Sequence, residues 1–99
     1  MPYILITRSP GQSLKEYQAV EDELGAEQPA GNIASLAGET ADGVLITADV
    51  WESSVAADRF AAEQLFPAFS RLGLAPGPDF SAWAFEGTEV EAPKPPLPS

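Results

Sequence analysis

The residues that could carry chemistry gather around one apolar segment, Val44–Trp51 (VLITADVW). Asp49 and Trp51 stand two positions apart, so on a strand their side chains would share one face. A carboxylate that is withdrawn from water without a partner has a raised pKa, and such a group can act as a general base. Asp49 is therefore the candidate base. The alternative is that Trp51 is an ordinary core residue and that Asp49 binds backbone or an arginine.

Further residues could complete such a site. Arg8 follows the first apolar segment and Arg59 lies in the second predicted helix, and either could pair with Asp49 or hold an enolate or phenolate. Tyr17 lies on an apolar helical stripe, where its hydroxyl could point into a pocket or reach solvent. Surface placement is the alternative for both arginines.

We therefore predict catalytic roles for Asp49, Arg8 and Tyr17. Substrate contacts are predicted for Trp51, Arg59, Phe60, Ser35 and Asn32. Edge-strand solvation is the alternative reading of the two polar strand residues, Asn32 and Ser35.

Composition narrows the chemistry further. The chain has neither cysteine nor histidine, so thiol chemistry and the commonest zinc and haem ligands are excluded. No glycine-rich phosphate loop stands between a strand and a helix. We therefore predict an activity that uses no metal and no cofactor.

Charge and hydropathy bear on partners and location. Fifteen acidic residues against five scattered basic ones give a net charge of −10, which argues against nucleic-acid binding. The chain contains no long apolar run, and no positively charged segment precedes the apolar stretch near its N-terminus. We therefore predict no membrane contact and a cytoplasmic protein.

The elements that must position these residues follow the order β-α-β-β-α-β. Tyr3–Thr7 and Asn32–Ala37 are predicted strands, and Asp42-Gly43 is a hairpin signal before the strand Val44–Trp51. Ser13 and Glu16 fit a capping box that opens a helix over Leu14–Leu24.

The second half repeats the pattern. Ser53 is the predicted cap of the next helix. A proline inside a helix costs about 3 kcal/mol, so we expect a break near Phe66 and a new short helix that Pro67 opens and Gly73 ends. Phe80–Glu86 is the last strand.

We expect one ferredoxin-like α+β domain over residues 1–88 and a proline-rich extended tail over 89–99. The tail is either loose or an arm that lies on a partner subunit.

Alternation makes both faces of the predicted antiparallel sheet apolar. Each face measures roughly 400 Å² in projection, at the upper end of what soluble monomers expose. Two such sheets packed face to face would hide this surface, so we predict a homodimer. The alternative is that loops or the tail cover it.

Several segments also carry a family resemblance. They are Tyr3–Thr7, the helix with Tyr17, Pro29–Gly31, Ala48–Ser53, and the helix with Phe60 and Leu65–Ala68. Over about residues 3–86 the chain resembles small actinobacterial proteins of the dimeric α/β-barrel superfamily, which includes antibiotic biosynthesis monooxygenase-like domains. Its sharpest element is Val50–Ser53.

The resemblance implies two sheets that form a barrel across a dimer, with an apolar pocket between sheet and helices in each subunit. It implies activities such as cofactor-free oxygenation of phenolic polyketides, polyketide cyclisation, lactone isomerisation or haem degradation. Relatives often place a histidine in the second strand. Here Ile33–Leu36 contains none, which argues against histidine-dependent chemistry.

Three functional hypotheses follow. The first is a cofactor-free monooxygenase, cyclase or isomerase of secondary metabolism that acts on an aromatic or polyketide-like substrate. The second is a non-catalytic homodimer that binds a small apolar or aromatic ligand or serves assembly. The third is a structural accessory protein whose proline-rich tail docks a partner.

Overall fold

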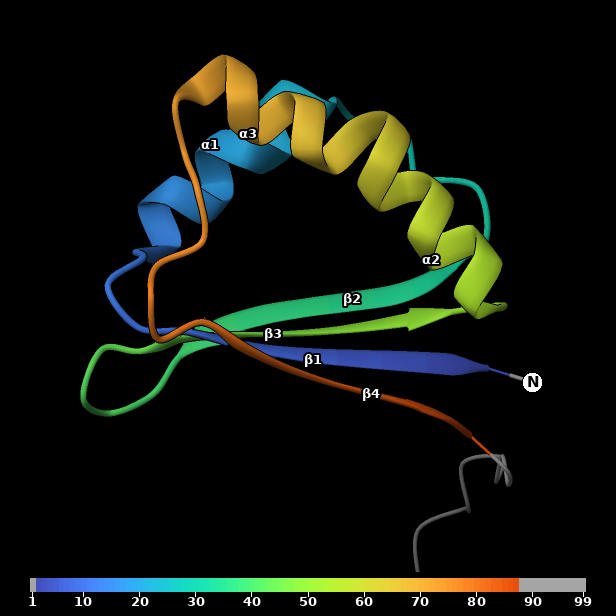
Figure 1. The fold of residues 1–99 in the computed structure, drawn as a ribbon, viewed down its shortest axis with the longest axis horizontal. Helices are drawn as coiled ribbons and strands as arrows, with labels where there is room; N and C mark the ends of the chain where they lie inside the picture. Colours follow the sequence, from blue (N-terminus) through green and yellow to red (C-terminus); the bar gives the residue numbers. More distant parts are fainter. Residues whose placement is uncertain (1, 88–99) are drawn as a thin grey trace, which may run out of the picture.

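A computed structural model of the chain describes residues 2–87, so the predicted tail lies outside the described part. One layer of helices arches over one face of a four-stranded sheet (Figure 1). The elements are β1 (Tyr3–Ser9), α1 (Leu14–Leu24), β2 (Asn32–Glu39), β3 (Leu45–Trp51), α2 (Ser54–Phe60), the π-helical turn η1 (Ala61–Leu65), α3 (Phe66–Leu72) and β4 (Ser81–Glu86).

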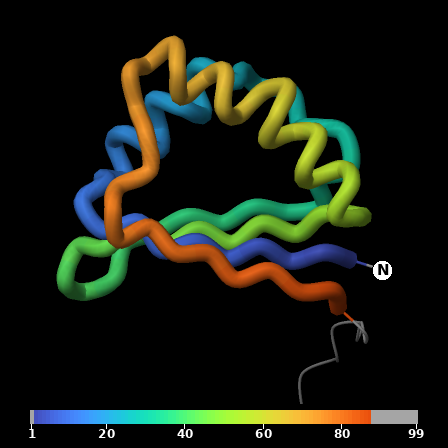
Figure 2. The backbone as a smooth tube through the Cα atoms, in the orientation of Figure 1, coloured from blue at the N-terminus to red at the C-terminus, as the bar shows by residue number. Residues whose placement is uncertain are grey.

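The sheet is antiparallel throughout, with the strand order β2-β3-β1-β4. β1 lies between β3 and β4, so the first and last strands are neighbours although most of the chain separates them (Figure 2). Both connections that carry helices cross the same face. This order confirms the predicted ferredoxin-like α+β fold.

Helix α1 forms for the local reasons that the sequence indicates. The Ser13 hydroxyl accepts the Glu16 amide at 3.1 Å, and the Glu16 carboxylate accepts the Ser13 amide at 3.4 Å. Val20 is buried on its inner face, and Gly25 ends it with φ +92°. The predicted capping box and both helix bounds are confirmed.

The second helical segment confirms one part of the prediction, since a separate short helix, α3, has Pro67 in its first turn and ends at Gly73, and it corrects the other part. No break occurs near Phe66, because the chain passes through the wider turn η1, where the Phe66 amide bonds to the carbonyl of Ala61. Pro67 then falls in the first turn of α3, where its missing N–H is tolerated. Gly73 ends α3, and its backbone lies in the left-handed region with φ +69°.

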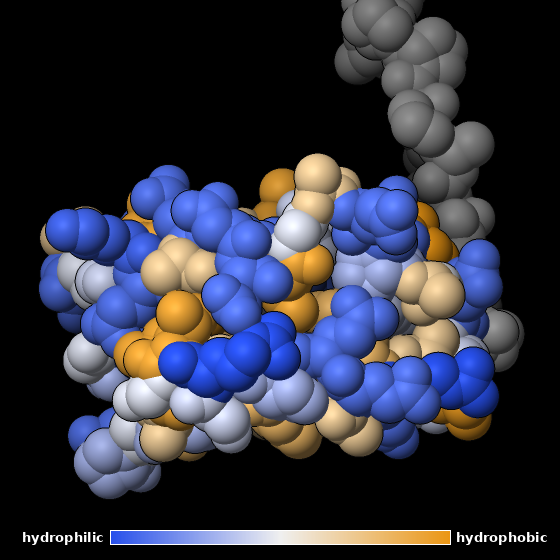
Figure 3. Space-filling model, turned by 90° about the horizontal axis from the view of Figure 1, so that it is seen from above, coloured by the Kyte–Doolittle hydropathy of each residue, from blue (hydrophilic) through white to orange (hydrophobic). Residues whose placement is uncertain are grey.

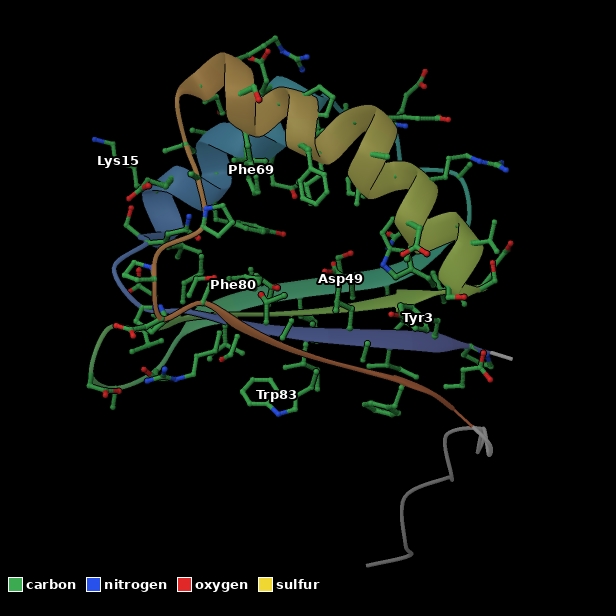
Figure 4. The ribbon with its side chains drawn as sticks, viewed as in Figure 1. Tyr3, Lys15, Asp49, Phe69, Phe80 and Trp83 are labelled. Carbon is green, nitrogen blue, oxygen red and sulfur yellow. The ribbon has the colours of Figure 1, made fainter. Side chains whose placement is uncertain are left out.

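Strand alternation divides the sheet into two faces. Leu5, Asp49 and Ser35 lie side by side across three strands on the helix-covered face. The opposite face carries Trp83, which points away from the helices and is 54% exposed (Figure 4). Leu36 and Phe85 are exposed as well, so this open face is apolar, as expected. The outer surface over the helices is mostly polar (Figure 3).

The hydrophobic core is small and lies between the helices and the covered face of the sheet. Its buried members are Val20, Leu45, Trp51, Ala57 and Ala68. The Trp51 and Phe60 rings meet at 5.1 Å with an interplanar angle of 37° and join β3 to α2. No helix within residues 2–87 is long and apolar enough to cross a membrane.

One glycine fixes the approach of the chain to α2. Gly31, just before β2, has φ +81°, and a Cβ on it would stand 2.6 Å from the Cβ of Ala56. Its carbonyl accepts the Glu52 amide at 2.8 Å. Only glycine satisfies both the backbone angle and the contact.

We expect Gly31→Ala to destabilise the fold more than Gly11→Ala does. Both glycines have positive φ, but a Cβ on Gly11 meets nothing within 4 Å. Gly11→Ala should therefore lose only the backbone term of about 1–2 kcal/mol, and Gly31→Ala a further ~1–3 kcal/mol from the clash. Urea unfolding followed by circular dichroism measures both. Equal losses of unfolding free energy in the two variants would mean that the backbone shifts near Ala56 and relieves the clash.

Candidate functional site

A cavity of about 620 Å³ lies between the helix layer and the covered face of the sheet. This volume falls in the range of small-molecule sites, roughly 300–1,000 Å³. Figure 4 shows Asp49 pointing up from the sheet and Phe69 pointing down from α3 into this space. The floor comes from all four strands, and the roof from α1, the end of α2, η1 and α3.

The walls of the cavity are largely apolar. Aromatic side chains approach it from β3, from α2 and α3, and from the segment before β4. The main apolar lining residues are Leu5, Val20, Leu24, Leu45, Trp51, Phe60, Leu65, Phe66, Phe69, Leu74 and Phe80. Such a surface suits a flat hydrophobic molecule.

Asp49 is the charged group of the floor. It lies opposite Leu5 of β1 and Ser35 of β2 and is partly buried. Burial raises the pKa of its carboxyl, a hydrogen bond with the Ser35 side chain lowers it, and the negative charge of Glu21 raises it. The balance is upward, which makes Asp49 a stronger base than an aspartate in water.

A hydrogen-bond network lies beside Asp49 on β2. Gln28 donates to the Asn32 carbonyl at 2.7 Å, and the Asn32 amide donates to the Ser35 hydroxyl at 3.1 Å and to the Val50 carbonyl at 3.3 Å. The Ser35 hydroxyl in turn donates to the Asn32 side-chain oxygen at 3.5 Å, which fixes the side chain opposite Asp49.

A β-bulge makes this network possible. Residues three apart on a regular strand point to opposite faces. The register of β2 shifts between Asn32 and Ala34, so both Asn32 and Ser35 face the cavity.

Tyr17 approaches from the roof. Burial, the charge of Glu21, a hydrogen bond to the Glu21 side chain and the charge of Asp49 together raise its pKa to about 12. The phenol therefore keeps its proton at neutral pH. It can donate a hydrogen bond and cannot serve as a base there.

The cavity brings together most of the residues that the sequence singles out. They are Asp49, Tyr17, Trp51, Phe60, Ser35 and Asn32. The pairing of Asp49 with an arginine is wrong. Arg8 lies on the opposite face, beside Ile46 of β3 and Ser81 of β4, because it shares the parity of Ile4 and Ile6. Arg59 is exposed on α2 and does not line the cavity.

Other lining residues were not anticipated. Glu21 stands four positions after Tyr17, and that helical spacing places both on one face. Thr7 and Thr47 face each other in the β1–β3 register, and their hydroxyls share a hydrogen bond beside Asp49. Alternation from Leu5 and Asp49 would have found both threonines. Within residues 2–87, no group of three or more His, Cys, Asp or Glu side chains could hold a metal ion.

Comparison with known proteins finds the same fold among solved structures but no match by sequence. No protein-family model matches the sequence, and no curated protein matches it significantly. Solved structures do match in fold. Rv0793 from Mycobacterium tuberculosis superimposes with a TM-score of 0.71 at 15% identity, over 93% of this chain and 100% of that one.

Two further matches have described activities. SnoaB from Streptomyces nogalater, a cofactor-independent oxygenase, gives a TM-score of 0.65 at 15% identity and covers 90% of this chain and 95% of its own. The ActVA-Orf6 monooxygenase of Streptomyces coelicolor, solved with nanaomycin D, gives 0.62 at 19% identity, with 93% and 92% covered. This chain therefore has the α+β fold of the antibiotic biosynthesis monooxygenase-like proteins.

Proposed function

We propose that the cavity binds a small aromatic or polyketide-like molecule and that Asp49 acts as general base in a reaction of secondary metabolism without a bound cofactor. The reaction is a monooxygenation, or a cyclisation or isomerisation that uses the same parts. The observation that carries the proposal is a carboxylate of raised pKa on the floor of an apolar cavity of ligand size.

The charge balance of the site favours this role. When Asp49 takes a proton from the substrate, one negative charge moves from the carboxylate to the substrate, and the total charge in the cavity stays the same. The apolar walls weaken the hydration of Asp49 beforehand, which strengthens it as a base. The Ser35 side chain lies opposite Asp49 on β2 and lowers the pKa of the carboxyl, which opposes part of the effect of burial.

Oxygenation then requires a substrate that gives an electron to O₂ once it is deprotonated. For an anthrone, a methylene and O₂ become a carbonyl and water, so one oxygen atom enters the product and the other leaves with both hydrogens. Tyr17 would donate a hydrogen bond to a substrate oxygen or to Glu21, since it keeps its proton to a pH of about 12. The activities described for SnoaB and ActVA-Orf6 support the monooxygenation.

A second candidate function is a non-catalytic homodimer that binds a ligand. The open sheet face favours the dimer, because Leu36 is 73% exposed and Trp83 and Phe85 are each more than half exposed. A second copy packed face to face would remove these side chains from water, at about 25 cal/mol per Å² of apolar surface. Such packing would also give the dimeric barrel of the predicted fold.

Replacing the base should remove the activity without removing binding. We expect Asp49→Asn to lower O₂ uptake with an anthrone or a naphthol at least about 100-fold, the usual contribution of a general base. Asp22→Asn is the matched control, since Asp22 is exposed on α1 and does not line the cavity. An oxygen electrode measures uptake, and product analysis without O₂ separates a cyclase from an oxygenase. Full activity of Asp49→Asn would refute the assignment.

The raised pKa of Asp49 also predicts a pH-dependent stability change. Below its pKa in the unfolded chain, which is near 3.8 as for an ordinary aspartate, the carboxyl is protonated in both states. As the pH rises through the folded pKa, ionisation costs the folded state stability. Asp49→Asn should therefore gain stability over the wild type as the pH rises from 3 to 7, measured by urea unfolding.

Asp42 provides the control of opposite sign. Its pKa is lowered, first by the hydrogen bond from the Thr40 side chain. Asp42→Asn should be less stable than the wild type above pH 4, and this difference in stability should vanish as the pH falls below the lowered pKa of Asp42. If both variants shifted in the same direction, the burial argument for Asp49 would fail.

The proposed dimer is tested at its centre. We expect Trp83→Glu to produce monomers in light scattering at micromolar concentration, because the interface would bury the new charge. Val55→Glu places the same charge on a 63% exposed residue of α2, away from the open face, and should stay dimeric. A monomeric wild type would contradict the dimer.

A further inference from the structure

The charges that face the cavity all have one sign. Asp49 lies on the floor, and Glu16, Glu21 and Glu27 reach it from α1 and the segment after α1. No lysine or arginine of residues 2–87 lines the cavity. The cavity is therefore both apolar and electronegative.

The basic residues of this part of the chain lie elsewhere. Arg71 pairs with Glu23 at 2.5 Å on the outer surface. Arg8 lies on the opposite sheet face, where its charge acts on Asp42. Lys15 and Arg59 are exposed and do not reach the lining.

The carboxylates differ in how far they are neutralised. Glu16 accepts the Ser13 amide at the positive end of α1, which offsets part of its charge. The groups that act most directly on Asp49 and Glu21 are neutral, the Ser35 side chain and the Tyr17 phenol. Neutral neighbours leave the negative charges of Asp49 and Glu21 in place.

The molecule already contains a probe of the resulting field. Tyr17 lines the same cavity, and its pKa is raised first by burial and then by the negative charges of Glu21 and Asp49, which make the ionised phenolate less favourable. A ligand anion at the same place would meet the same repulsion. Asp49 is partly buried among apolar walls, so the repulsion from Asp49 is screened less than that from a charge on the open surface.

We infer that the cavity selects aromatic ligands by charge: it accepts a flat ligand that is neutral or carries a protonated amine, and it rejects one that carries a carboxylate or phosphate. The inference rests on the proposed function, since it names the substrate class of the same site. The rings of Trp51 and Phe60 provide the aromatic contact, and their faces attract a cation where the ligand carries one.

This selection has a chemical consequence for the proposed reaction. A substrate with a free carboxylate would bring a second negative charge next to Asp49. A neutral substrate that ionises in place only moves the charge of Asp49 onto itself. The substrate should therefore enter with its acidic groups protonated, esterified or amidated.

Three probes that share a 2-naphthyl ring and differ in charge test the inference. They are 2-naphthylmethanol, 2-naphthylmethylamine and 2-naphthylacetate, which are neutral, cationic and anionic at pH 7. We expect the alcohol and the amine to bind in calorimetry at low ionic strength, and the acetate to bind at least about tenfold more weakly than the alcohol. Added salt should narrow the difference.

Variants locate the source of the selection. Glu21→Gln and Asp49→Asn should each narrow the difference between the acetate and the alcohol about threefold or more. Asp22→Asn removes one charge from the neighbouring position of α1, outside the lining, and should leave the difference unchanged. A change in Asp22→Asn as large as that in Glu21→Gln would mean that only the net charge of −10 matters, and the inference would fail.

The outcomes separate the two proposals. If the acetate binds as tightly as the alcohol, the charge selection is wrong while the cavity remains a ligand site. If none of the three probes binds, both proposals fall. If the alcohol and the amine bind but Asp49→Asn keeps full activity in the oxygen assay, charge selection stands and the base assignment does not.

Discussion

The pairing of β1 with β3 is the constraint on which the rest of the molecule depends. Its register sets Leu5 opposite Asp49 and Thr7 opposite Thr47, so one parity of residues faces the helices and the other faces away. A slip by one residue would turn Asp49 and Trp51 to the open face and bring Val50 and Ala48 inside. Cavity, core and open surface are all consequences of this one alignment.

Helix α2 holds the helix layer to the sheet at one side of the cavity. Trp51 packs on Phe60, and Gly31 lets the chain approach Ala56 closely. A chain of 99 residues that surrounds a cavity of about 620 Å³ and partly buries an aspartate gives up stability that a packed apolar core would supply. Such sacrifices are typical of functional sites.

Sequence reasoning succeeded where local rules decide. Ser13 and Glu16 cap α1 through contacts within one turn, and the shared parity of Asp49 and Trp51 needs only the strand between them. Arg8 shows where such reasoning stops. The sequence indicates that Arg8 shares a strand face with Ile4 and Ile6. Which of the two faces lies under the helices depends on strand order and register, and these arise from packing of the whole chain. The bulge that turns Asn32 beside Ser35 was equally invisible to simple alternation.

The turn η1 has an effect beyond tolerating Pro67. A π-turn amounts to one residue inserted into an α-helix, and each residue advances a helix by about 100°. Everything after Leu65 is therefore rotated relative to α2, and Phe69 reaches the cavity in that rotated phase. The roof thus consists of two halves with separately adjustable orientation. Insertion or loss of a single residue in this turn would change which side chains of α3 face the cavity. The side chains that α2 and the sheet contribute would keep their positions. Such a change offers a simple route by which cavities on this fold could diverge in shape.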